Sequence, residues 1–188
     1  MWQLKNIKNK HMKLISFGEY IDGKSFKVVD ERQMRGSAGI MLLLGIIAFI
    51  NGFIIKNYSI IPYISGFLAL NFMIGIFVNP KFSPTILLAR LFTWEQSAMP
   101  IGAVQKKFAW SLGLSLSIGI FILSLYLLND VKFFEPVCML CLICLLFLYL
   151  ETAFGICVGC KLYFWSIRLK LIPKPTERPN CMGNSCEV

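Results

Sequence analysis

Apolar residues fill four long stretches of the chain, and short polar segments separate them. The stretches are about Gly36–Ile55, Ile60–Val78, Phe108–Leu128 and Phe133–Cys157. A helix needs roughly 20 consecutive apolar residues to cross a hydrocarbon core about 30 Å thick, and each stretch is close to or above that length. The pattern therefore predicts an all-α membrane protein with four transmembrane helices.

The polar segments between these stretches differ in length. Lys56–Ser59 and Asn129–Lys132 are too short for anything but tight turns, so we expect two antiparallel helical hairpins. The longer connection Asn79–Lys107 joins the hairpins. We divide the chain into an N-terminal cytoplasmic segment, a four-helix transmembrane domain and a C-terminal part with an interfacial helix and a cysteine-containing tail: 1–35, 36–160 and 161–188.

Three segments outside the predicted spans have patterns of their own. Phe17–Val29 has apolar residues on both sides of Asp22-Gly23, a dipeptide that favours a two-residue turn, so we expect a small cytoplasmic hairpin. Pro84–Trp94 begins with a proline suited to a helix start and has an apolar side, as a helix lying in the membrane interface would. Lys161–Ile172 combines aromatic and basic residues and is predicted to be a second interfacial helix.

Composition and charge agree with a membrane location. Apolar residues make up 56% of the chain and charged residues 15%, against roughly 45–50% apolar in soluble domains. The net charge of +9 comes from Lys and Arg residues that lie almost wholly between or outside the apolar stretches, so we do not expect nucleic-acid binding. Because basic loops stay in the cytoplasm, this distribution predicts that both termini and the central connection are cytoplasmic.

Seven cysteines are present, and they form three groups. Cys138, Cys141 and Cys144 repeat every three residues in the fourth span. They are interpreted either as small apolar side chains packing against other helices or as an intramembrane thiol or soft-metal site. The other two groups are Cys157 with Cys160, and Cys181 with Cys186 in the polar tail.

The Cys157-Val158-Gly159-Cys160 sequence carries the strongest chemical signal. Its spacing lets two sulfurs approach for disulfide exchange or for sharing a thiophilic metal. The cytoplasm keeps thiols reduced, which favours a reactive dithiol or a metal site over a permanent disulfide. In the alternative interpretation, Gly155 and Gly159 form a packing face and the cysteines are further small residues beside it.

The position of this pair relative to a helix decides how its charge is stabilised. If Cys157 and Cys160 end the fourth helix, the helix dipole disfavours a thiolate. If Gly159 breaks the chain and Cys160 begins the next helix, the dipole and Lys161 favour it. The tail is long enough to bring Cys181 and Cys186 back to the pair, where four sulfurs could hold zinc or copper(I). In the other interpretation, the tail carries two exposed, unlinked thiols.

Glu151 is the most conspicuous ionisable residue near a membrane span, and such residues are functional candidates by default. Projected on one continuous helix, it points away from both Cys157 and Cys160. We therefore expect it to be hydrated at the interface or to pair with a basic residue of another helix, such as Arg35 or Arg90.

Four motifs together resemble a known family: Val29-Asp30-Glu31-Arg32 with Arg35, Asn79-Pro80-Lys81-Phe82-Ser83-Pro84, Gln105-Lys106-Lys107-Phe108-Ala109-Trp110, and Glu151-Thr152-Ala153-Phe154-Gly155-Ile156-Cys157-Val158-Gly159-Cys160-Lys161-Leu162-Tyr163. The chain is similar over roughly residues 29–165 to the membrane family catalogued as domain of unknown function 4395. The resemblance implies a four-helix protein of the bacterial inner membrane with a cysteine pair after the last span, and it implies no activity. It also marks Glu31 and Arg35, and we expect at least one of them to pair with a group such as Glu151 or Glu95.

Three functional hypotheses follow. In the first, Cys157 and Cys160 exchange electrons or sulfane sulfur with a cytoplasmic thiol or sulfur-transfer protein, and Cys181 and Cys186 act as a mobile second dithiol. In the second, these two and Cys181 and Cys186 hold zinc or copper(I). In the third, the cysteines are inert and the protein is a helix-packing subunit of a membrane complex.

Overall fold

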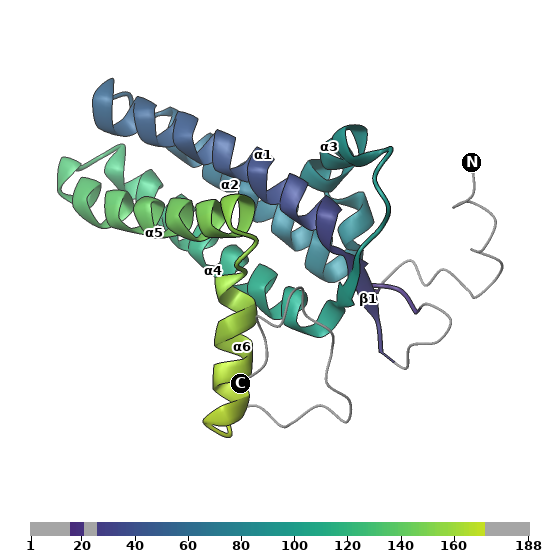
Figure 1. The fold of residues 1–188 in the computed structure, drawn as a ribbon. Coiled ribbons are helices and arrows are strands. Elements are labelled where there is room, and N and C mark those ends of the chain that lie inside the picture. Colours follow the sequence, from purple (N-terminus) through teal and green to yellow (C-terminus); the bar gives the residue numbers. More distant parts are fainter. Residues whose placement is uncertain (1–15, 21–25, 172–188) are drawn as a thin grey trace.

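The computed structural model describes residues 16–20 and 26–171. Within this part of the chain, four helices are long and apolar enough to cross a membrane: Glu31–Ile54, Ile60–Val78, Ala103–Leu127 and Val131–Ala153. They contain α1 (Glu31–Phe49) with η1 (Ile50–Ile54), α2 (Ile60–Met73) with η2 (Ile74–Val78), α4 (Ala103–Leu127), and η4 (Val131–Phe133) with α5 (Phe134–Ala153). Figure 1 shows them lying along one another as a bundle, as expected for a multi-pass membrane protein.

Two spans begin five residues earlier than the apolar pattern predicts. The first starts at Glu31 instead of Gly36, because Asp30 caps it by accepting a hydrogen bond from the backbone N–H of Arg32 at 3.1 Å. The third starts at Ala103 instead of Phe108 and so includes the charged turn around Lys106. Hydropathy does not find these turns, because they carry charged residues; Glu31 and Lys106 are paired with each other across the two helices.

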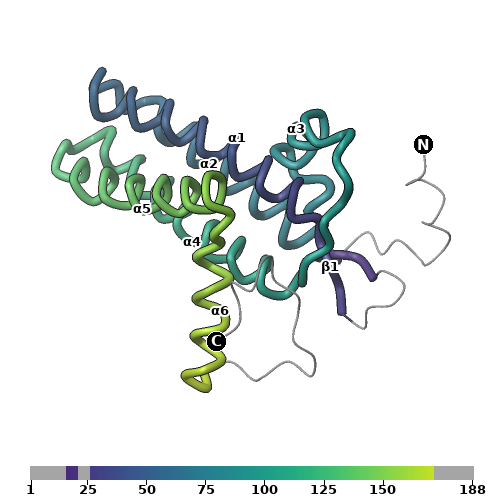
Figure 2. Tube along the Cα trace, viewed as in Figure 1, coloured from purple at the N-terminus to yellow at the C-terminus, as the bar shows by residue number. Residues whose placement is uncertain are grey.

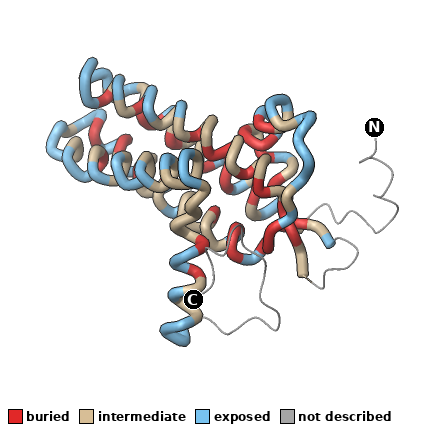
Figure 3. Tube along the Cα trace, viewed as in Figure 1, coloured by how far each residue is buried: buried red, intermediate tan, exposed pale blue. Residues whose placement is uncertain are grey.

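The bundle is held mainly by contacts between helices that are not consecutive in the chain. The most extensive contacts are those of α2 with α4, and of α1 with α5 and with α3. The main contacts therefore do not lie within the two predicted hairpins. One buried cluster includes Phe72 and Trp110, whose rings meet edge to face with centroids 5.4 Å apart. A second cluster includes Ile120 and Val137. Figure 3 shows that buried positions concentrate on the facing sides of the helices, whereas α5 is mostly exposed or partly buried.

A short helix after the second span is fixed by a buried polar network. α3 (Pro84–Thr93) follows η3 (Pro80–Phe82). The side-chain oxygen of Asn71 in α2 accepts hydrogen bonds from Ser83 Oγ at 2.6 Å, Thr85 N at 3.0 Å and Thr85 Oγ1 at 3.0 Å. Ser37 of α1 adds a 2.6 Å bond to Thr85 Oγ1. All four side chains are fully buried, so the network ties α3 to both spans. The position of α3 in a membrane interface remains a prediction.

Two short strands close one end of the bundle. β1 (Val28–Asp30) pairs antiparallel with β2 (Pro100–Gly102), with Val28 opposite Gly102. An antiparallel bridge also joins Glu19 to Val28, on the two sides of the predicted hairpin turn. The turn itself, Asp22-Gly23, lies outside the described residues. The β2 strand is not expected from the sequence, because three residues carry too little periodicity.

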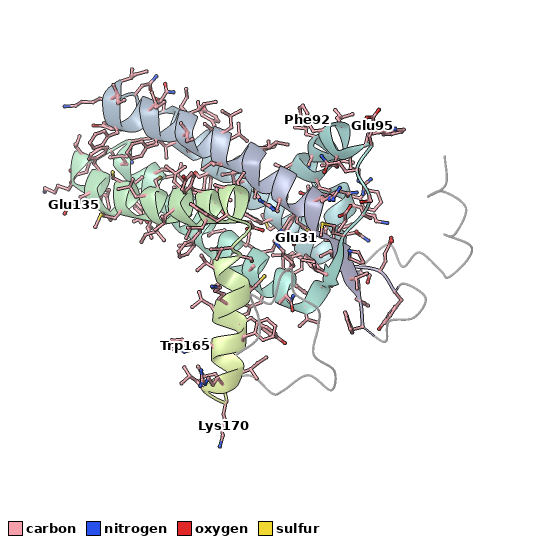
Figure 4. The ribbon with its side chains drawn as sticks, in the orientation of Figure 1. Glu31, Phe92, Glu95, Glu135, Trp165 and Lys170 are labelled. Carbon is pink, nitrogen blue, oxygen red and sulfur yellow. The ribbon has the colours of Figure 1, made fainter. Side chains whose placement is uncertain are left out.

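The last described helix, α6 (Val158–Arg168), leaves the bundle at a steep angle (Figures 1 and 2). Figure 4 labels Trp165 and Lys170 along and just after this helix, away from the four spans. The exposed side chain of Trp165 and the basic residues Arg168 and Lys170 are those expected of an interfacial helix, and that placement remains a prediction.

Candidate functional site

A break in the chain between α5 and α6 positions the cysteine pair. α5 ends at Ala153, and Gly155 adopts a positive φ of 68°, a conformation that glycine adopts at little cost. The N–H of Ile156 then bonds to the carbonyl of Leu150 at 3.0 Å. The prediction that the fourth helix continues to Cys157 is therefore wrong. The breaking residue is Gly155 and not Gly159.

Cys157 and Cys160 lie in the first turn of α6. Cys157 is the N-cap residue, and its sulfur accepts a hydrogen bond from the backbone N–H of Cys160 at 3.3 Å. The two sulfur atoms are 2.6 Å apart. The positive end of the helix dipole thus points at the Cys157 sulfur, which favours negative charge there. The pair thus lies at the beginning of a helix and not at the end of one.

The two thiols have different surroundings. Cys160 is 5% exposed, whereas Cys157 is partly exposed. The hydrogen bond to Cys157 and, next, burial raise the pKa of the Cys160 thiol well above its usual range. Cys160 therefore keeps its proton and donates it toward the Cys157 sulfur. The more accessible Cys157 is the sulfur that a reaction partner would meet first.

Gly159 lets α6 pack directly against α4. A Cβ atom at this position would lie 2.5 Å from Ala109 Cβ and 2.6 Å from Ala109 Cα. A side chain does not fit against that backbone, so glycine is required by the close approach of the two helices. The expectation of a small-residue packing face is thus met at Gly159, in addition to any chemistry of the cysteines beside it.

A buried lysine lies beside the cysteine pair. The Lys106 side chain is 1% exposed, and its Nζ atom lies 2.6 Å from Glu151 Oε1 and 3.1 Å from Glu31 Oε2. The charge of Lys106 acts on both Cys157 and Cys160. The apolar pattern places Lys106 in the connection Asn79–Lys107, whereas the structure makes it the centre of an ion cluster that joins α1, α4 and α5. Three predicted site features are therefore brought together: the cysteine pair, Glu31 and Glu151.

Glu151 is placed differently from its projection on a straight helix. The prediction that it points away from the cysteine pair is wrong, because α5 ends before Cys157 and the chain turns back. Glu151 contacts Lys106 and lines the same cavity as Cys157. The expectation that it pairs with a basic residue of another helix is confirmed in kind, although the partner is Lys106 and neither Arg35 nor Arg90.

Arg35 has a structural contact near the same break. Its Nη2 atom donates to the backbone carbonyl of Thr152 at 2.9 Å, which satisfies a carbonyl at the end of α5. The expectation that at least one of Glu31 and Arg35 pairs with a loop or helix-end group is confirmed, because Glu31 pairs with Lys106 in the first turn of α4. The partner is therefore a lysine and neither Glu151 nor Glu95. Arg35 does lie close enough to Glu31 to interact with its charge.

The remaining cysteines fall in two places. Cys141 and Cys144 pack against the cluster around Ile120 and Val137 and also line the cavity. Cys181 and Cys186 lie outside the described residues. Within residues 16–20 and 26–171, no group of three or more Cys, His, Asp or Glu side chains is arranged to hold a metal ion. The described part of the site thus offers a metal two sulfur ligands, Cys157 and Cys160.

Sequence reasoning missed Lys106 and the Asn71 network. The available signals were a lysine next to the predicted start of a span and an asparagine inside an apolar stretch, both costly positions for polar groups.

Comparison with known families matches residues 29–168 to the model described as "Domain of unknown function (DUF4395)". No match is found among curated proteins or among solved structures.

Proposed function

We propose, for a chain that belongs to the family described as "Domain of unknown function (DUF4395)", that Cys157 and Cys160 are a redox-active dithiol at the edge of the membrane. The observation that carries this proposal is the placement of two sulfurs in contact at the N-terminus of α6, 2.6 Å apart. The proposed activity is reversible thiol–disulfide exchange with a cytoplasmic protein. Transfer of sulfane sulfur would use the same accessible sulfur, Cys157.

The exchange has two balanced steps. The Cys157 thiolate attacks one sulfur of a partner disulfide, which forms a mixed disulfide and releases one partner thiolate. The Cys160 thiolate, formed as its proton is lost, then attacks the Cys157 sulfur. This step releases the second partner thiolate and leaves a Cys157–Cys160 disulfide. Read in reverse, the same steps oxidise a partner dithiol.

The surroundings of the two sulfurs support these roles. Cys157 is the more accessible of the two. Its sulfur accepts a hydrogen bond from the backbone N–H of Cys160 and lies at the positive end of the α6 dipole. Cys160 is buried and keeps its proton, as a resolving thiol should until it is needed. The Lys106 ammonium adds a nearby positive charge that offsets the developing thiolate.

A redox titration tests the proposal. Purified protein in detergent is equilibrated with mixtures of reduced and oxidised dithiothreitol, quenched with acid and mapped by mass spectrometry. We expect one reversible transition that converts free Cys157 and Cys160 into a disulfide between them, with the same midpoint in a Cys144→Ser variant. Absence of this disulfide at every ratio would contradict the proposal.

The orientation of the chain is part of the proposal. Both termini are proposed to be cytoplasmic, because basic residues remain concentrated outside the spans even after Lys106 is assigned to the ion cluster. Reporter fusions after Ile172 should be active in the cytoplasm. Activity only in the periplasm would move the cysteine pair to the oxidising side and exclude a cytoplasmic partner.

A further inference from the structure

A cavity of about 120 Å³, open on part of its surface, lies where the four spans meet. Its walls come from α1, α2, α4, α5 and the start of α6. Its lining includes Cys157 and Glu151 at the site and Ile120 among the residues deeper in the bundle. An engineered cavity of roughly 150 Å³ in another protein binds benzene. The present cavity is somewhat smaller but is open on part of its surface, so a single six-membered ring can enter beside Cys157 with its substituents extending outward.

The wall of this cavity is apolar. Met41, Leu68 and Leu116 are typical of its lining. The serine hydroxyls in it are already used, since Ser65 Oγ donates to the carbonyl of Ile61 at 2.8 Å and Ser117 Oγ to the carbonyl of Leu114 at 2.9 Å. A charged, water-soluble thiol such as glutathione would lose its hydration there without compensation. The cavity suits a molecule that is dissolved in the bilayer.

The thiols at the site limit what such a molecule can do. Converting Cys157 and Cys160 into a disulfide releases two electrons and two protons. The chemical class that is soluble in hydrocarbon, built on a six-membered ring and able to accept both is the quinones. We propose that the central cavity binds the ring of a membrane quinone, which oxidises the Cys157–Cys160 dithiol. This inference rests on the proposed thiol–disulfide activity and gives it a direction.

The overall step balances. Both S–H bonds break and one S–S bond forms between Cys157 and Cys160. The quinone takes up the two electrons and two protons and leaves as a hydroquinone. The ion cluster lies at this end of the cavity, where Lys106 holds Glu151 at 2.6 Å.

The probe for this proposal is duroquinone, a fully methylated benzoquinone that accepts electrons but has no free ring position for thiol addition. Reduced protein in detergent is mixed with it, and quinone absorbance is followed together with mass-spectrometric mapping of the disulfide. We expect one hydroquinone for each Cys157–Cys160 disulfide formed, and no reaction above background in Cys157→Ser. Diamide, a soluble oxidant that does not need the cavity, is used in parallel.

Two variants of α4 separate the cavity from the thiols. Leu116→Trp fills the cavity, whereas Ile118→Trp adds the same side chain two residues away at an exposed position outside the lining. We expect Leu116→Trp to slow duroquinone reduction at least tenfold and Ile118→Trp to leave it unchanged. Both variants should form the disulfide with diamide at the wild-type rate, which also shows that the site is folded.

The outcomes distinguish this inference from the proposed function. Disulfide formation with diamide but not with duroquinone would overturn the quinone proposal and leave thiol–disulfide exchange standing. Equal duroquinone rates in Leu116→Trp and wild type would overturn the cavity as the binding site. Failure of diamide itself to link Cys157 with Cys160 would contradict the proposed function.

Discussion

Lys106 and Glu151 form the contact that connects the membrane spans to the cysteine pair. The Nζ atom of Lys106 lies 2.6 Å from Glu151 Oε1, and the same ammonium lies 3.1 Å from Glu31 Oε2. Lys106 is almost fully buried, so its charge is compensated by protein groups and not by water. The first turn of α1, the first turn of α4 and the last turn of α5 are thereby held together beside Cys157 and Cys160.

Removal of the Lys106 charge should destabilise the fold strongly. Lys106→Met leaves Glu31 and Glu151 without their ammonium, and breaking a buried pair costs about 3 to 5 kcal/mol. The matched control is Lys107→Met, because Lys107 is exposed and should change stability by less than about 0.5 kcal/mol. Chemical unfolding in detergent measures both. Equal stability of the two variants would contradict the ion cluster.

Substitution of Gly159 should separate α6 from α4. A Cβ at Gly159 would lie 2.6 Å from Ala109 Cα, so Gly159→Ala forces the helices apart and displaces the cysteine pair. Gly119→Ala is the control, since a Cβ there meets nothing within 4 Å. We expect Gly159→Ala to reduce the rate of Cys157–Cys160 disulfide formation with diamide by at least tenfold. A wild-type rate for this variant would refute the close contact.

The Asn71 network should contribute to stability independently of the cysteines. Asn71→Leu leaves the donors of Ser83 and Thr85 buried without their acceptor, at a cost on the order of 3 kcal/mol. Asn129→Leu changes an exposed asparagine in the turn before η4 and should have little effect. Thermal unfolding in detergent provides the comparison. The redox midpoint of the cysteine pair should be the same in both variants.

The reactivity of Cys160 should depend on pH differently from that of an ordinary thiol. Hydrogen bonding to Cys157 and burial raise its pKa, so it remains protonated at pH values where a free cysteine, with a pKa of about 8.5, is largely thiolate. In reduced protein, iodoacetamide should therefore modify Cys160 slowly at pH 9 and faster only at higher pH. Equal rates for Cys160 and a model peptide at pH 9 would contradict this.

The same shift affects stability in alkaline solution. The folded protein holds the Cys160 proton more tightly than the unfolded chain does, so this stabilisation is complete below about pH 8.5 and is lost as pH rises above it. Cys160→Ser should remove this part of the pH dependence. Unfolding curves of the reduced proteins at pH 7 and pH 10 supply the measurement.

The spans were predictable because they depend on hydropathy, which can be summed over consecutive residues of the chain. About twenty consecutive apolar residues predict a membrane span whatever their packing partners are. The span Ile60–Val78 is therefore predicted with its observed bounds. The ends of the other spans were harder to predict. Glu31 and Lys106 lie in helical turns because each finds an opposite charge 75 residues away in the sequence, and no local pattern carries that information.

The sequence predicted which cysteines form the candidate site but not how they are arranged relative to the helices. The spacing of Cys157 and Cys160 identified the pair, but assigning it to one helix end or the other required the break at Gly155. A glycine with a positive φ is not distinguishable in sequence from a glycine that packs against a neighbouring helix, as Gly159 does. Because the chain breaks at Gly155, Glu151 lies beside the cysteine pair, whereas one continuous helix would place it on a different face from the pair.

The central claim is that Cys157 and Cys160 act as one reactive dithiol, and trapping a mixed disulfide tests it most directly. Reduced wild type and the single variants Cys157→Ser, Cys160→Ser, Cys144→Ser and Cys181→Ser are treated with 5,5′-dithiobis(2-nitrobenzoate), and each cysteine is mapped by mass spectrometry. Wild type and Cys144→Ser should give the Cys157–Cys160 disulfide, and Cys181→Ser an intermediate yield if the tail reaches the pair. Cys160→Ser should retain the adduct on Cys157, and Cys157→Ser should leave Cys160 slow to react. Equal modification of all cysteines in every variant would contradict the account and leave a helix-packing role for these residues.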